Sequence, residues 1–150
     1  MKICGISDIH GDLSVKIQPC DVLCICGDIV PLEVQVNSKK SKRWLKELFI
    51  PWCSKQPCKK VLVVGGNHDF FLWHHPLQMK EMVKEEEKIE YLLNEGYEFE
   101  GVKFFGTPLC KEFGYWAFMY PYDEQDRILD KALEEWGKNI DVLLTHDSPY

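Results

Sequence analysis

The apolar residues of the chain fall into short unbroken runs, separated by longer segments in which they recur every three or four positions. Short apolar runs that are rich in β-branched residues and bounded by Gly, Pro or Asp predict buried strands. Two of these runs end at a Gly and one follows a Pro-Cys-Asp break. The runs that predict strands are Lys2–Ser7, Val22–Cys26, Val61–Val64 and Asp141–Thr145.

Three segments have the period of an amphipathic helix. In the segment Asn37–Ser54, one face carries Trp44, Leu45, Leu48, Phe49 and Trp52. Pro51 is expected to end or kink this helix because proline has no backbone N–H. We also predict a helix over Pro76–Leu93, and a third that Asp123 caps and Gly137 ends.

Two further segments between these elements have recognisable patterns. Tyr97–Gly106 contains two short apolar runs around Glu100-Gly101, which predicts an antiparallel hairpin. Thr107–Tyr122 is rich in aromatic residues and too long for a tight connection. Such a segment is either a lid packed over the core or a functional loop.

Polar side chains with catalytic potential follow four of the predicted strands. Helical segments separate several of these strands, so right-handed crossovers would bring their carboxyl ends to one edge. Any one of these polar turns has an ordinary explanation, but four at the same strand end predict a shared site. The side chains are Asp8 and His10, Asp28, Asn67 and His68, and His146.

The chemistry of this set indicates a metal site. It offers carboxylate, imidazole and amide oxygen without a thiolate, which suits Mn²⁺, Fe or Zn²⁺ better than a structural cysteine site would. Asp28 is the natural bridging carboxylate, because two neighbouring cations need negative charge between them.

Composition narrows the class of protein. The 150 residues are 45% hydrophobic and 28% charged, as in one soluble globular domain. A net charge of −6 argues against nonspecific binding to nucleic acid. The seven cysteines cannot all pair and are expected to be reduced. With no apolar run near the roughly 20 residues of a membrane span, we expect a cytoplasmic protein.

The order of these motifs resembles the calcineurin-like metallophosphoesterase superfamily, in particular its small phosphoesterases. The resemblance rests on Asp8-Ile9-His10, Gly27-Asp28, Gly66-Asn67-His68-Asp69 and Thr145-His146, with Gly106-Thr107-Pro108 and Trp116-Ala117-Phe118 in support. It implies an α/β sandwich of two mixed β-sheets flanked by helices, with two divalent ions at the strand ends. Mn²⁺ is the expected metal, with Fe, Zn²⁺ and Ni²⁺ as alternatives.

The resemblance also implies a role for each residue of the site. Asp8 and His10 would bind the first ion, Asp28 would bridge, and Asn67 and His146 would bind the second. His68 would face the substrate, and Asp69 would orient its imidazole. A metal-held hydroxide would then hydrolyse a phosphomonoester or phosphodiester, with a small molecule favoured over nucleic acid as the substrate.

One part of the family pattern is absent from this sequence. The family closes with Gly-His-x-His, and these 150 residues contain no such element. We therefore expect a single domain truncated at its C-terminus, with impaired activity and an open sheet edge through which copies can associate. Two alternatives stay open: a non-catalytic protein-binding module on the same fold, or replacement of the lost ligands by His74, His75 or a neighbouring chain.

Overall fold

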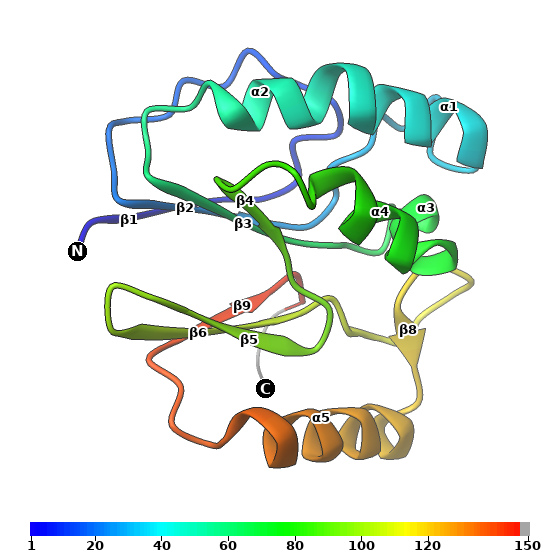
Figure 1. Cartoon of the computed structure of the whole chain (residues 1–150). Helices are drawn as coiled ribbons and strands as arrows, with labels where there is room; N and C mark the ends of the chain where they lie inside the picture. The colour runs from blue at the N-terminus through cyan, green and yellow to red at the C-terminus, as the bar shows by residue number, and fades with distance from the viewer. Residues whose placement is uncertain (148–150) are drawn as a thin grey trace.

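Two β-sheets pack face to face between two layers of helices in the computed structural model, which describes residues 1–147 (Figure 1). The first sheet has the order β1-β2-β3-β4 and is parallel throughout. The second has the order β5-β6-β9 and is mixed. The strands of the first sheet are β1 (Ile3–Ile6), β2 (Val22–Cys26), β3 (Lys60–Val64) and β4 (Ile89–Tyr91). Those of the second are β5 (Glu95–Phe99), β6 (Val102–Thr107) and β9 (Val142–Thr145).

The predicted α/β sandwich of two sheets flanked by helices is confirmed. One detail differs, because only the second of the two sheets is mixed. The three strands predicted at Lys2–Ser7, Val22–Cys26 and Val61–Val64 lie side by side in the first sheet, and the one predicted at Asp141–Thr145 is β9 of the second.

The central strands β2 and β3 are covered on both faces, which explains their unbroken apolar runs. Residues facing the helices form the larger core, with Leu23, Ile25, Val61 and Val63 at its centre. Residues facing the second sheet form a smaller core that includes Val22, Cys24, Leu62 and Val64. Cys26 lies opposite Val64 in the ladder, so the two strands end at the same level.

The first helical prediction, Asn37–Ser54, is confirmed. It comprises α1 (Ser38–Trp44), a π-helical turn η1 (Leu45–Phe49) and α2 (Ile50–Ser54). The side chain of Asn37 caps it by accepting the Lys40 N–H at 3.1 Å. Pro51 does not end the helix: the preceding turn is π-helical, with the Ile50 N–H donating to Leu45 O, and such turns absorb local mismatch in the ladder.

The second helical prediction, Pro76–Leu93, is wrong beyond its first half. Helix α4 (Pro76–Val83) follows a short α3 (Phe70–His74), and Ile89–Tyr91 is the strand β4. Pairing with β3 makes this segment a strand, because Ile89 and Tyr91 lie opposite Val61 and Val63. Both are buried, on either side of a half-exposed Glu90. The charged run before them forms the turn.

The hairpin prediction is confirmed, with a turn at Glu100 and Gly101, both at positive φ. The two short strands β7 (Cys110–Lys111) and β8 (Met119–Tyr120) lie within the predicted aromatic loop. Helix α5 (Tyr122–Trp136) covers the outer face of the second sheet (Figure 1). Its N-cap is Pro121 rather than Asp123, which lies in the first turn, where a carboxylate is favourable to the helix dipole.

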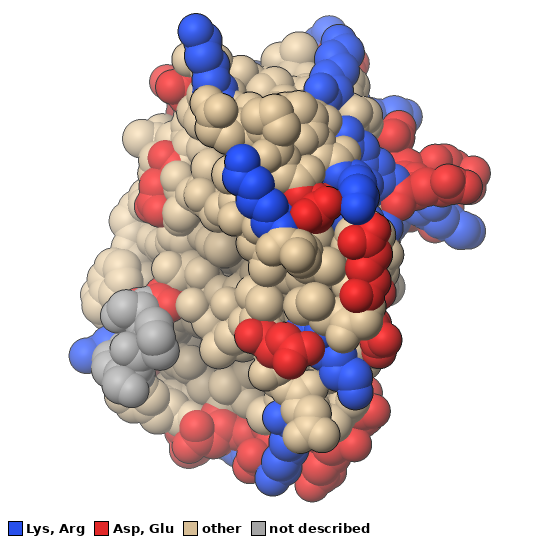
Figure 2. All heavy atoms as spheres, turned by 90° about the vertical axis from the view of Figure 1, so that its left-hand side faces the viewer, with Lys and Arg blue, Asp and Glu red and all other residues tan. Residues whose placement is uncertain are grey.

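Strand β9 forms one edge of the second sheet among the described strands, and Leu143 on it is 54% exposed. All seven cysteines are unpaired. Figure 2 shows the face at the left of Figure 1, where acidic side chains lie along the lower edge over α5. In residues 1–147, no helix is long and apolar enough to cross a membrane.

Candidate metal centre

The loops after β1 and β2 run side by side and carry Asp8, His10 and Asp28. Backbone hydrogen bonds join them, from the Asp8 N–H to Gly27 O at 3.1 Å and from the His10 N–H to Asp28 O at 2.9 Å. The backbone φ angle is positive in all three residues, at 55° for Asp8, 41° for His10 and 52° for Asp28. Left-handed backbone is uncommon outside glycine, although Asp and His adopt it more readily than most residues, and it is concentrated at functional sites.

Two glycines allow the remaining side chains to come close. Gly27 has φ of 86°, and a Cβ there would lie 2.5 Å from Nδ1 of His146. A Cβ on Gly66 would overlap the backbone amide and the carboxylate of Asp28. These glycines after β2 and β3 therefore allow the His146 ring and the Asp28 loop to lie against the backbone of the site.

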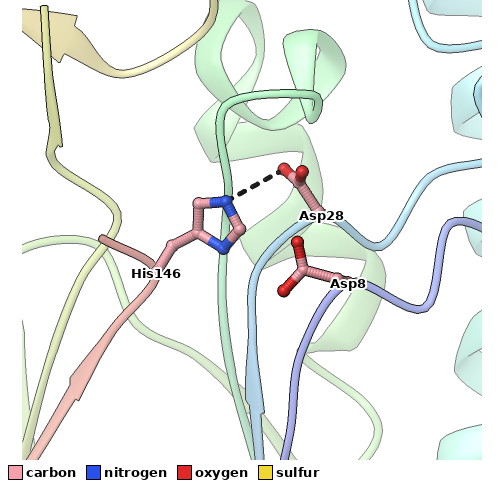
Figure 3. A group of neighbouring side chains, drawn as sticks. All are labelled: Asp8, Asp28 and His146. Carbon is pink, nitrogen blue, oxygen red and sulfur yellow. Dashed lines mark ion pairs between the residues drawn. The ribbon is translucent and has the colours of Figure 1, made fainter. Parts of the chain in front are cut away.

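His146 reaches the site from the other sheet, immediately after β9. Figure 3 shows its ring facing the carboxylates of Asp28 and Asp8, which come from the ends of β2 and β1. Its Nδ1–H donates to Cys26 O at 2.8 Å. Its Nε2 lies 2.8 Å from Asn67 Oδ1 and 3.4 Å from Asp28 Oδ1. One imidazole thus connects the ends of three strands.

These contacts fit a bound cation. Nδ1 of His146 donates its hydrogen to a carbonyl, and Nε2 faces two oxygen atoms, Asn67 Oδ1 and Asp28 Oδ1. Ligand atoms of Asp8, Asp28 and His146 lie within 4.8 Å of one another. Two ligands of one ion, at about 2.0–2.2 Å each, lie within about 4.4 Å of each other, so small side-chain movements would close this group around a cation.

His10 stands at the rim of this group. Its Nε2 lies 3.6 Å from Asp28 Oδ2, and its side chain is 28% exposed. Its Nδ1 is buried without a hydrogen-bond partner in the described structure. Asp28 itself is 3% exposed, so its carboxylate is enclosed by the imidazoles of His10, His68 and His146.

His68 belongs to the site by its backbone and its side chain. Its N–H donates to Asp28 Oδ1 at 2.8 Å, and its Nε2 lies 3.9 Å from Asp28 Oδ2. Its Nδ1 is 2.6 Å from Gln35 Oε1, which fixes the hydrogen on Nδ1 and leaves Nε2 facing the site. Gln35 could not be predicted from the sequence, because it lies in a loop without any periodic signal.

The expectation that Asp69 orients His68 is not what the described contacts show. Asp69 is fully buried, and its carboxylate accepts the N–H groups of Ile29, Val30 and Gly66 at 2.8–3.2 Å. Burial raises the pKa of Asp69 to about 7, while these amide hydrogen bonds act in the opposite direction. Asp69 therefore ties the loop after β2 to the loop after β3, and Gln35 holds the imidazole instead.

Two other histidines lie outside this group. His74 stacks against Trp73, with ring centroids 4.6 Å apart. His75 packs on Phe71 at 5.3 Å. Neither belongs to the described group of potential metal ligands, so nothing in residues 1–147 supports them as substitutes for a missing ligand.

Comparison with known proteins gives three results. The family model described as calcineurin-like phosphoesterase matches residues 1–150. The chain is 27% identical, over 160 aligned residues, to part of a protein from Emericella nidulans named probable rhamnogalacturonate lyase C. That match covers 99% of this chain and 14% of the other protein. A solved crystal structure is similar with a TM-score of 0.65 and 18% identity, over 94% of this chain and 66% of that one, which shows the fold alone.

Proposed function

The chain belongs to the calcineurin-like phosphoesterase family, and on this premise we propose that it hydrolyses a phosphate ester with the help of divalent metal ions. The observation that supports this most directly is the convergence of Asp8, Asp28 and His146 from three separate strand ends. Asp8, His10 and the buried Asp28 also share positive φ, and such backbone is concentrated at functional sites.

We propose the same ligands as the motif order implies. Asp8 and His10 would serve one ion, Asn67 and His146 a second, and Asp28 both. Bound there, the ions would polarise the phosphoryl group and lower the pKa of water. The metal we propose is Mn²⁺, as the family resemblance implies, with Fe, Zn²⁺ and Ni²⁺ as alternatives that the same carboxylate, imidazole and amide ligands can bind.

The side chains of the protein supply positioning and proton transfer. The Nδ1–H of His68 donates to Gln35, so Nε2 faces the site, and the protonated ring would give its Nε2 hydrogen to the ester oxygen that leaves. The side chain of His68 is 22% exposed and that of Asp28 beside it 4% exposed, so His68 is the group a substrate can touch. Buried Asp28 accepts the His68 backbone N–H and would also hold the ions.

We further propose a small phosphoester as the substrate, one domain over residues 1–150, and a cytoplasmic site of action. The open edge at β9, with Leu143 exposed, gives a second copy a place to associate. The ligand set lacks the Gly-His-x-His element of the family, and loss of ligands lowers metal affinity, so this 150-residue form should be a weak enzyme.

The test is hydrolysis of bis(p-nitrophenyl) phosphate and p-nitrophenyl phosphate by the metal-free protein after addition of Mn²⁺. We expect slow turnover that saturates with Mn²⁺ and is lost in Asp28→Asn. If the protein binds two ions and releases no p-nitrophenol from either ester, the proposal is wrong, and a non-catalytic binding module on this fold is favoured.

A further inference from the structure

An aromatic segment, residues 112–118, borders the candidate metal centre and is anchored by backbone hydrogen bonds. The Ala117 N–H donates to Asn67 O, and the Cys110 N–H to Phe118 O, both at 3.0 Å. Phe118 is 3% exposed at φ of 57°, and its ring occupies the space where a side chain on Gly65 would sit. This segment is therefore fastened to the backbone of the strand end that carries Asn67.

Trp116 is the residue of this segment that contacts the site. Its ring lies 4.5 Å from the ring of His68, tilted by 46°, and 6.1 Å from Phe70. Trp116 is only half-buried, so part of the indole stays open beside His68. Its neighbours Phe113 and Tyr115 are 69% and 102% exposed.

The His68 ring also contacts two polar groups, Gln35 Oε1 at 2.6 Å and the ring of His10 at 5.2 Å. A half-buried aromatic side chain next to convergent polar groups, as Trp116 is here, is typical of a ligand site.

We propose that the substrate is a phosphate ester of an aromatic alcohol, whose ring stacks on Trp116 while its phosphate lies at the ions that Asp8, Asp28 and His146 would hold. This inference rests on the proposed function. Because His68 lies between Trp116 and Asp28, an ester oxygen beside His68 Nε2 directs the rest of the alcohol toward the indole. Aromatic rings at such separations attract each other beyond the burial of their area. Trp116 is then a specificity-determining residue.

The test compares three phosphonates that share one head group and cannot be hydrolysed: methyl-, cyclohexyl- and phenylphosphonate. Calorimetry measures their binding to the Mn²⁺-loaded protein. We expect phenylphosphonate to bind about tenfold more tightly than the methyl compound, and more tightly than the cyclohexyl compound, since a stacked ring contributes up to about a factor of ten.

Trp116→Leu keeps an apolar side chain but removes the indole. It should abolish the preference for phenyl over cyclohexyl and leave the affinity for methylphosphonate within about twofold. Trp116→Phe, which keeps a ring, should retain part of the preference. Leu48→Ala, which removes an exposed apolar side chain of the helical layer, is the matched control and should retain all of it.

Equal binding of phenyl and cyclohexyl compounds by the unaltered protein would overturn the proposal, and so would a preference that survives in Trp116→Leu. These outcomes differ from failure of the proposed function. If phosphoesters are hydrolysed without any aromatic preference, only the substrate class is wrong. If the phenyl preference is found without hydrolysis of any ester, the aromatic subsite stands and the catalytic proposal falls.

Discussion

Asn67 Oδ1 and His146 Nε2 lie 2.8 Å apart, although they follow strands of two different sheets. The first sheet presents Asn67 after β3, and the second presents His146 after β9. The ring donates from Nδ1 to Cys26 O and turns Nε2 toward Asn67 Oδ1. Imidazole nitrogen and amide oxygen are both metal ligands, so the docking of the sheets and the proposed metal binding depend on the same pair of side chains.

The first prediction concerns which histidines bind metal. His146→Ala should weaken Mn²⁺ binding by more than about tenfold, because even groups that only support a ligand contribute tenfold or more. The control is the double variant His74→Ala/His75→Ala, whose rings stack on Trp73 and Phe71 away from the site. Its affinity should be unchanged in a calorimetric titration. A similar loss in both proteins would show that the site has been misplaced.

A second prediction concerns stability in the presence of metal. Binding to the folded state alone stabilises it by about 2.7 kcal/mol when free metal is at 100 times the dissociation constant. Mn²⁺ should therefore raise the Tm of the unaltered protein, and EDTA should reverse the rise. Asp28→Asn removes the carboxylate that all three imidazoles face. Its Tm should not respond to Mn²⁺, and an equal response in that variant would contradict the assignment.

The third prediction tests whether Gln35 acts in catalysis, by positioning His68, or only stabilises the fold. Gln35→Ala frees the His68 imidazole to rotate, so kcat should fall about tenfold while the Tm changes by less than about 2 °C. Gln35→Glu places a carboxylate beside Nδ1, and a neighbouring negative charge favours the protonated form of an imidazole. The ring of the variant then keeps its proton to higher pH, so the basic limb of the kcat profile should move to higher pH. An unmoved profile would exclude His68 as the proton donor.

A fourth prediction uses two glycines with nearly the same backbone. Gly27 and Gly101 have φ of 86° and 80°. A Cβ on Gly101 meets nothing within 4 Å, so Gly101→Ala should cost about 1–2 kcal/mol from left-handed backbone alone. Gly27→Ala adds a clash with the His146 ring and should cost more and weaken metal binding. Chemical denaturation measures both, and equal costs would mean that His146 can move aside freely.

The fifth prediction concerns Asp69. Its carboxylate oxygens accept hydrogen bonds from the backbone N–H groups of Ile29, Val30 and Gly66. In Asp69→Asn, the side-chain NH₂ would replace one of these oxygens and face a backbone N–H donor. Asp69→Asn should destabilise the fold by about 1–3 kcal/mol, because a buried amide donor loses its acceptor. Asp126→Asn on the exposed face of α5 is the control and should be neutral. If Asp69→Asn lowers kcat and leaves the unfolding free energy intact, Asp69 is catalytic after all.

The strand ends of this fold could be predicted because their signals are local. A buried run followed at once by Asp, Asn or His identifies both the strand and the polar group, as at Val64 and Asn67. Strand β4 could not be predicted in the same way, because Ile89–Tyr91 is three residues long and fits helical and strand periods equally. Only pairing with β3 makes it a strand.

The contacts of the site depend on distant loops, and this is where sequence reasoning failed. Gln35 and His68 are 33 positions apart, and nothing near Gln35 marks it as a partner of an imidazole. Asp69 follows His68 directly, which suggested a contact between them. In the fold its carboxylate turns inward to the loop after β2, because unpaired amides there need an acceptor.

The delivery of His146 by β9 has a consequence for synthesis on the ribosome. The strands of the first sheet end with β4 at Tyr91, and β9 begins only at Val142. At about 5–20 residues per second, the nascent chain would present Asp8, His10, Asp28 and Asn67 seconds before His146 emerges. During that interval the early residues form at most a partial metal site. Metal captured at this stage would complete its coordination only when His146 arrives, so maturation of the site should report the docking of β9.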